Sequence, residues 1–105
     1  MSRTLVELEG MVARVSDVYA DRFGIRRDDD WFILKLQEEL GELTAEYLRG
    51  TERARLNGAS AVDLRTALEN EAADVLAMLL LFAQRNGIDL DAALQRKWFK
   101  YLPPE

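Results

Sequence analysis

The amino-acid sequence predicts an all-α domain of four helices, and three observations favour this class. Apolar residues recur every three or four positions in four successive segments, which is the periodicity of a helix with one buried face. The segments are separated by short stretches rich in Gly, Asp and Asn, which are typical of helix ends and turns. A chain of 105 residues is long enough for one hydrophobic core but not for two, and no internal repeat or domain linker is visible. We therefore expect a single domain over residues 1–105.

The composition narrows the classes of function. Hydrophobic residues make up 49% of the chain and charged residues 31%, as in a soluble, folded protein. The absence of cysteine excludes disulfides and thiolate metal sites, and the absence of histidine excludes imidazole ligands and histidine acid–base catalysis. A formal net charge of −5 argues against polymeric nucleic acid as a partner, because phosphates attract clustered Lys and Arg. Phosphate chemistry in so acidic a chain therefore requires a bound cation.

No segment has the pattern of a targeting or membrane-spanning sequence. The first ten residues, MSRTLVELEG, contain no uninterrupted apolar run of signal-peptide length. The most apolar segment, residues 75–83, is too short to span a bilayer. We therefore expect a cytoplasmic protein with no membrane partner.

The first helix is predicted over about residues 4–23. Its apolar stripe consists of Leu5, Leu8, Val12, Val15 and Tyr19. Gly24 is a suitable end for it, because glycine readily adopts the left-handed conformation that closes a helix. The charged connector that follows contains the run Asp28, Asp29 and Asp30, which we expect to supply the N-cap of the next helix and to complement its dipole.

The second helix is predicted over about residues 31–49, with Gly50 as its stop. One face carries six apolar residues: Phe32, Ile33, Leu36, Leu40, Leu43 and Tyr47. Glu39, Glu42 and Glu46 follow the border of that face. Carboxylates that serve only solubility more usually gather opposite the apolar face, so these acids are expected at the edge of the core.

The third helix follows a polar connection over residues 51–60. Ser60 and Asp63 form a capping box that opens it, and it is predicted to continue to Asn86, where Gly87 closes it. Residues 75–83, VLAMLLLFA, are apolar on every side of the helix. Three neighbouring helices of a small monomer are too few to cover such a segment. We therefore expect a homodimer or homotetramer in which it packs against another subunit, most simply through a two-fold interface.

The last helix is predicted to begin with Asp89 as its N-cap and to end before Pro103 and Pro104. Its apolar face consists of Leu94, Trp98, Tyr101 and Leu102. Basic residues lie beside that face: Arg96, Lys97 and Lys100.

Two acidic pairs form the strongest candidate site. Residues three apart on a helix project in neighbouring directions, so Glu39 pairs with Glu42, and Glu71 pairs with Asp74. Four oxygen donors without nitrogen or sulfur suit Mg²⁺, or Mn²⁺ in its place. Without a cation, such clustered carboxylates repel one another and take up protons. One such pair alone is usually a solvated face, whereas two pairs that border apolar stripes on separate helices favour a metal site.

Three stretches of the chain resemble a known family. They are KLQEELGEL at residues 35–43, ENEAADVLAML at residues 69–79 and NGIDLDAALQRKWFKYL at residues 86–102. Together they resemble the MazG-like all-α nucleoside triphosphate pyrophosphohydrolases, relatives of the dimeric dUTPases. The signature of that family is Glu-x-x-Glu, a variable gap and Glu-x-x-Asp. The resemblance covers roughly residues 31–101.

The resemblance implies Mg²⁺-dependent hydrolysis of a nucleoside triphosphate between its α and β phosphates, which gives a monophosphate and pyrophosphate. By position, Glu39, Glu42, Glu71 and Asp74 are then the metal ligands. A house-cleaning role against non-standard nucleotides is one function that it suggests. Glu38 lies next to the ligands and is a candidate to position or deprotonate the attacking water, with a merely solvated glutamate as an equal alternative.

Substrate contacts are expected from both ends of the matched region. Lys97, Lys100 and Tyr101 resemble the basic and aromatic ending that contacts phosphates in the family, although the two lysines also suit simple complementation of a helix dipole. Lys35 is expected to pair with Glu39 or to contact phosphate. Trp31 and Phe32 are candidates to stack on a base, although packing in the core or at an interface is the more usual role of aromatic residues near a helix start.

Two further functions fit the same sequence. The first is a catalytically silent helical oligomer, an interaction or regulatory module with a structural cation. The second is hydrolysis of phosphoribosyl-ATP, a sister activity on the same fold. Fold alone does not separate these functions, because one scaffold hosts many chemistries.

Overall fold

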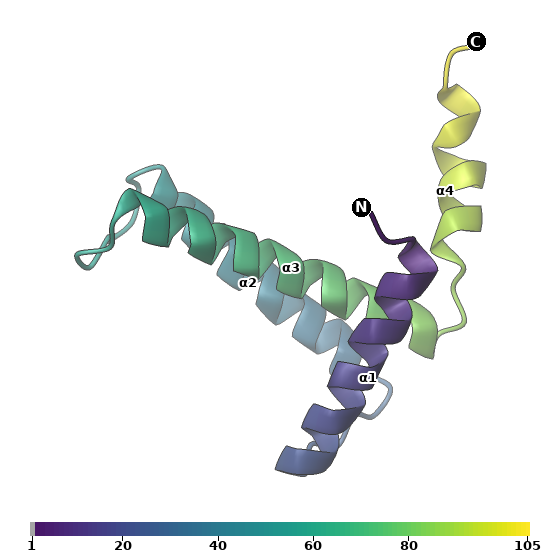
Figure 1. Cartoon of the computed structure of the whole chain (residues 1–105), viewed down its shortest axis with the longest axis horizontal. Coiled ribbons are helices and arrows are strands. Elements are labelled where there is room, and N and C mark those ends of the chain that lie inside the picture. The colour runs from purple at the N-terminus through teal and green to yellow at the C-terminus, as the bar shows by residue number, and fades with distance from the viewer. Residues whose placement is uncertain (1) are drawn as a thin grey trace.

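The computed structural model describes residues 2–105 and is helical throughout its regular elements (Figure 1). The elements are α1 (Leu5–Phe23), α2 (Trp31–Gly50), α3 (Ala61–Arg85), α4 (Leu90–Lys97) and a short 3₁₀-helix η1 (Phe99–Tyr101). No strand occurs among residues 2–105. The all-α prediction is therefore confirmed.

Three of the helices begin where the sequence predicts, and each has a side-chain cap at its N-terminus. Thr4 and Glu7 form a capping box at the start of α1, and Ser60 and Asp63 form one at the start of α3. The Asp89 side chain accepts a hydrogen bond of 3.0 Å from the backbone amide of Ala92. Each contact satisfies backbone N–H groups that the first turn of a helix leaves without partners.

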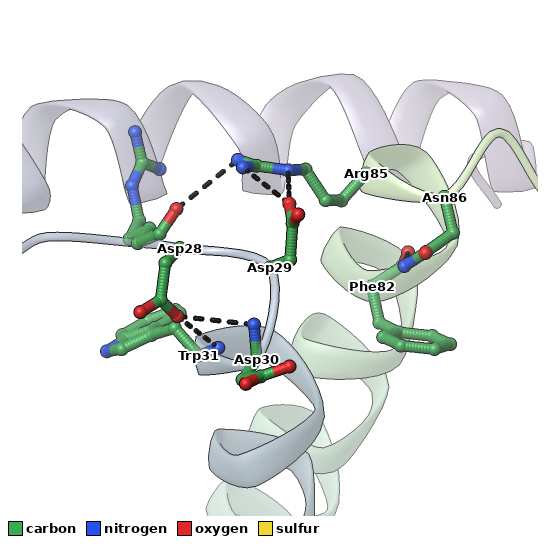
Figure 2. Close-up of polar contacts among 8 residues, drawn as sticks. Asp28, Asp29, Asp30, Trp31, Phe82, Arg85 and Asn86 are labelled. Atoms are coloured by element: carbon green, nitrogen blue, oxygen red, sulfur yellow. Dashed lines mark hydrogen bonds and ion pairs between the residues drawn. The ribbon is translucent and has the colours of Figure 1, made fainter.

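The three aspartates before α2 divide their roles. Asp30 occupies the N-cap position but makes no capping bond, and the Asp28 Oδ1 atom instead accepts bonds from the amides of Asp30 and Trp31, at 3.2 and 3.0 Å. Asp29 is 2.9 Å from the Arg85 Nη2 atom at the end of α3 (Figure 2). The Arg85 guanidinium also donates to the Arg27 carbonyl oxygen. The connector is therefore tied to the far end of α3, which positions the start of α2.

The helices α2 and α3 form a long antiparallel hairpin, and α1 packs on α3 towards the end of the hairpin that is remote from the α2–α3 loop (Figure 1). The buried apolar residues are Ala20, Phe32, Leu80, Leu81 and Ala83. The core is thus small and lies where α1 meets the hairpin. None of the described helices combines the length and the hydropathy needed to cross a membrane.

The fourth helix is shorter than predicted. It is α-helical only to Lys97, and η1 continues it as a 3₁₀-helix in which the Leu102 amide donates to the Phe99 carbonyl at 3.0 Å. Pro103 and Pro104 have no N–H groups, so α-helical bonds to the carbonyls four residues earlier cannot form. The tighter 3₁₀ pattern recovers one of these carbonyls. α4 and η1 together project away from the hairpin, so the single chain does not close into a four-helix bundle (Figure 1).

Candidate metal centre

The two acidic stretches meet across the α2–α3 hairpin. One carboxylate oxygen each from Glu39, Glu42 and Glu71 lies within 4.8 Å of the other two. The first two residues come from one turn of α2, and the third comes from the facing turn of α3. The structure thus brings together three of the four predicted ligands, in a cluster that has the spacing to hold a cation.

Asp74, the fourth predicted ligand, lies at the rim of this cluster. It is one turn beyond Glu71 on α3, it is exposed, and it lies outside the group of mutually close oxygens. Its negative charge nevertheless contributes to raising the pKa of both Glu39 and Glu71. Asp74 is therefore an electrostatic neighbour of the cluster and not a member of its tightest part.

Two oxygens of the cluster are buried without a hydrogen-bond donor. They are the Oε2 atoms of Glu39 and Glu71. The side chain of Glu39 is only 12% exposed, and its nearest basic group, the Lys35 Nζ atom, is 3.9 Å from its other oxygen. Buried polar atoms almost always have partners, and leaving one without costs about 1–3 kcal/mol. The two orphaned oxygens belong to residues of the acidic cluster, and a group of carboxylate oxygens is the environment that a hard divalent cation prefers.

Glu39 and Glu71, each half-buried, resist ionisation. Burial, then a hydrogen bond with Glu42 and the charges of Glu42 and Asp74, raise the pKa of Glu39 to about 7, and Lys35 offsets only part of this. Burial is also the largest cause that raises the pKa of Glu71, followed by the charge of Glu42. Near neutral pH the cluster therefore retains a proton unless a cation takes its place.

These raised pKa values predict how stability depends on pH. We expect the melting temperature in EDTA to fall as the pH rises from about 5 to about 8. The folded state holds a proton on Glu39 that the unfolded chain releases near the ordinary pKa of 4.5, so this contribution to stability is complete below that value and is lost as the pH passes about 7. Mg²⁺ added at pH 8 should raise the melting temperature more than at pH 5, where protons compete with it.

Circular dichroism melts with and without Mg²⁺ measure this dependence. Glu39→Gln is the matched variant, because an amide keeps the shape but cannot titrate, and it should flatten the pH profile. A profile that is the same for the two proteins would contradict the account of the cluster.

The candidate catalytic residue Glu38 lies outside the cluster. Its side chain is 54% exposed and its Oε2 atom is 3.2 Å from the Lys35 Nζ atom. Lys35 therefore bridges Glu38 and Glu39 and neutralises the cluster only in part. Glu46, the third acid along the border of α2, is bound by Arg49 at 2.9 Å and is likewise not available to it.

A cavity of about 680 Å³ between α1, α2 and α3 adjoins the acids. Trp31 and Lys35 line it together with Glu39 and Asp74, so two of the expected substrate-binding residues and two of the expected ligands share one space. Much of the remaining wall is apolar: Leu8, Met11, Val12, Val15, Met78 and Leu81. The sequence did not reveal that α1 lines a cavity, because residues that line a cavity and residues that fill a core give the same apolar stripe.

The basic and aromatic ending lies apart from the acids in the single chain. Lys97, Lys100 and Tyr101 line a separate hollow on α4 and η1, together with Arg96 and Trp98. Lys100 lies over the Tyr101 ring, with its Nζ atom 5.1 Å from the ring centroid. The phosphate-binding role of these three residues therefore stays a prediction.

Comparison of the chain with protein-family models, with curated proteins and with solved structures finds no match. The acidic cluster and the cavity beside it are therefore the features of the molecule that bear on its function.

Proposed function

We propose that the protein is a MazG-like nucleotide pyrophosphohydrolase that depends on Mg²⁺, with Mn²⁺ as a substitute. In this reaction water adds to a nucleoside triphosphate and the bond between the α and β phosphates breaks, which yields a nucleoside monophosphate and pyrophosphate. The observation that carries the proposal is the convergence of Glu39, Glu42 and Glu71, with two buried oxygens that have no donor. A site built only for solubility would not bury unpaired carboxylate oxygens.

The acids of the hairpin would hold the cation, with Glu39, Glu42 and Glu71 as ligands and Asp74 at the rim. The bound cation supplies charge neutralisation for the triphosphate and a water of lowered pKa. Glu38 accepts a hydrogen bond from Lys35 through its Oε2 atom, which leaves its Oε1 atom to take the proton of the attacking water. The same Lys35 ammonium faces the cavity and is placed to contact a phosphate.

The cavity supplies a compartment for the nucleoside. Its apolar walls suit a base, and Trp31 offers an aromatic surface for stacking. Glu39 and Asp74 lie at its edge, so a nucleoside bound there would direct its phosphates towards the acids. The net charge of −5 favours such a small substrate, neutralised locally, over a polymeric nucleic acid.

We further propose that the active form is a homodimer or homotetramer that acts on the cytoplasmic nucleotide pool. Only five apolar residues are buried among residues 2–105, which is too small a core for a stable monomer of this length. A partner copy would supply the missing apolar contacts.

A nucleotide panel tests the proposed activity. The purified protein is incubated with Mg²⁺ and common or damaged nucleoside triphosphates, and with phosphoribosyl-ATP, and the products are separated by ion-exchange chromatography. We expect pyrophosphate and a monophosphate from at least one triphosphate, and no activity in EDTA. Release of inorganic phosphate and a diphosphate would contradict the proposed bond cleavage. Inactivity across the panel with both Mg²⁺ and Mn²⁺ would favour the silent helical module.

A further inference from the structure

The cavity beside the acids has a guanidinium in its wall that the proposed reaction does not use. It belongs to Arg27, in the connector between α1 and α2, and the side chain is only 24% exposed. Arg27 also lies before residues 31–101, so the resemblance to a known family assigns it no role. A half-buried charge in a largely apolar wall calls for a physical explanation.

The helix α2 separates Arg27 from the acids. Trp31, Lys35 and Glu39 line the cavity at intervals of about one turn, so Glu39 lies about 12 Å along the helix from Trp31. The connector leads directly into α2, because the Trp31 amide donates to the Asp28 carbonyl at 3.2 Å. Arg27 is therefore at the start of α2, two turns or more from Glu39.

The helix α3 gives the same order. Asp74 and Leu81 both line the cavity, and Leu81 lies about 10 Å further along the helix. Leu81 also shares with Arg27 the lining of an adjoining hollow of about 130 Å³. One turn later, Arg85 donates to the Arg27 carbonyl at 3.3 Å. The acids are thus at one end of the cavity and Arg27 is at the other.

The helix α1 holds the guanidinium in place. The Arg27 Nη1 atom donates to the Ser16 Oγ atom at 2.8 Å, and its Nη2 atom is 3.0 Å from the Asp17 Oδ1 atom. These two contacts leave further N–H groups of the guanidinium for a ligand in the cavity. Because the group is planar and is held at two of its nitrogens, those N–H groups have fixed directions. Arg3 also lines the cavity, but it is exposed.

The Arg27 end of the cavity is rich in hydrogen-bond donors. The Arg27 guanidinium and the indole of Trp31 can only donate. Among residues 2–105, no Asn or Gln lines the cavity, and its two carboxylates, those of Glu39 and Asp74, are at the other end. A ligand therefore fits this end best with a carbonyl oxygen, whereas an amino group there would meet another donor.

We propose that Arg27 determines which bases the protein accepts. With the phosphates at the acids, Arg27 donates to the far edge of the base and selects an oxo group there over an amino group. Uracil is then preferred to cytosine, and hypoxanthine or guanine to adenine, because cytosine and adenine present amino donors on that edge. Hydrolytic deamination converts amino bases into oxo bases, so the preferred class includes damaged nucleotides. This inference rests on the proposed function, which supplies the direction of the nucleotide in the cavity.

Two pairs of triphosphates test the preference. Inosine triphosphate is compared with ATP, and dUTP with dCTP, because each pair shares its sugar and phosphates and differs at the oxo or amino position. We expect kcat/KM to be about 10-fold or more higher for the oxo member of each pair. Arg27→Gln should bring both ratios close to one, since an amide offers an acceptor as well as a donor.

Arg26→Gln is the matched control, because Arg26 is the exposed neighbour of Arg27 and does not line the cavity. We expect it to leave both ratios unchanged. A loss of positive charge alone alters KM for both members of a pair equally, so the ratio isolates the contact with the base. Ratios close to one in the wild-type protein, or ratios unchanged in Arg27→Gln, would overturn the inference.

Arg27→Lys decides the matter if Arg27→Gln does not fold. Lysine can keep the ion pair with Asp17, which is 3.0 Å from the guanidinium in the wild-type protein, but it lacks the planar set of N–H groups. We expect it to fold and to lower both ratios several-fold. Ratios equal to those of the wild-type protein would overturn the inference.

Equilibrium binding separates this inference from the proposed activity. Trp98→Phe leaves Trp31 as the single tryptophan, so its fluorescence reports on a ligand in the cavity. With Mg²⁺ present, we expect inosine monophosphate to bind about 10-fold or more tightly than AMP, and Arg27→Gln to remove the difference. This result without hydrolysis of any triphosphate would refute the activity and keep the inference. Hydrolysis without a preference for oxo bases would overturn the inference alone, and neither binding nor hydrolysis would overturn both.

Discussion

Replacement of Glu42 by Gln is expected to lower Mg²⁺-dependent pyrophosphate release by at least about 100-fold. Glu42 has a carboxylate oxygen within 4.8 Å of those of Glu39 and Glu71, and its charge acts on both of them. The amide keeps the size of the side chain but removes an anionic ligand. Changes in the groups that merely orient metal ligands already cost about 10- to 100-fold, so loss of a ligand should cost more. The measurement is the rate on the best triphosphate of the panel.

The same substitution should raise the melting temperature in EDTA at pH 8. Glu42 repels Glu39 and Glu71 in the absence of a cation, and Gln removes that repulsion. Lower activity with higher stability separates loss of a ligand from ordinary damage to the fold, which lowers both. Glu69→Gln is the control, because Glu69 is an exposed glutamate of α3 paired with Arg65 at 3.0 Å, and it should change neither quantity appreciably. Retained activity in Glu42→Gln, or activity lost together with the helical signal, would contradict this prediction.

Truncation of Leu80 to Ala is expected to have the largest effect on folding. Leu80 is 1% exposed and is the largest fully buried side chain of the described residues. Substitutions of this kind cost about 2–5 kcal/mol, through lost apolar burial and the cavity left behind. Because so few residues are buried, few neighbouring side chains can move to fill the space that the substitution leaves. Urea unfolding followed by circular dichroism measures the loss.

Leu34→Ala is the matched control for this experiment, because Leu34 is 65% exposed. We expect it to change the free energy of unfolding by no more than about 0.5 kcal/mol. Both variants must be compared at one protein concentration, since the stability of the proposed homo-oligomer would rise with concentration. If the two substitutions lowered the free energy of unfolding by similar amounts, Leu80 would not be at the centre of the core.

The helices and most of their ends were predictable because local chemistry decides them. Ser60 with Asp63, and Asp89, act on backbone groups within the same turn, so their effect can be read directly from the sequence. The sequence analysis placed the end of α4 too far along the chain. Prolines lack the N–H groups that would bond to the carbonyls four residues earlier, so the α-helical pattern ends before the prolines themselves. The role of Asp29 also escaped prediction, since its partner Arg85 is 56 residues away.

The candidate site was predictable only in part. The spacing of Glu39 and Glu42 makes their side chains project in neighbouring directions from one helix. Their approach to Glu71, however, depends on the register of α2 against α3. That register leaves Asp74 at the rim. The cavity depends on the angle at which α1 crosses the hairpin, and the position of the basic ending depends on the direction of α4 after the turn at Gly87, where φ is +64°. Neither angle is encoded in a local pattern of residues.

The most direct test of whether the carboxylates of α2 and α3 bind a common cation is a titration of the protein with Mn²⁺. Electron paramagnetic resonance follows the concentration of the free ion. The account predicts that the wild-type protein removes Mn²⁺ from solution, that added Mg²⁺ displaces it, and that Glu42→Gln binds it much more weakly. An Mn²⁺ signal that stays that of the free ion in the presence of the wild-type protein, or equal binding by the wild-type protein and Glu42→Gln, would contradict it.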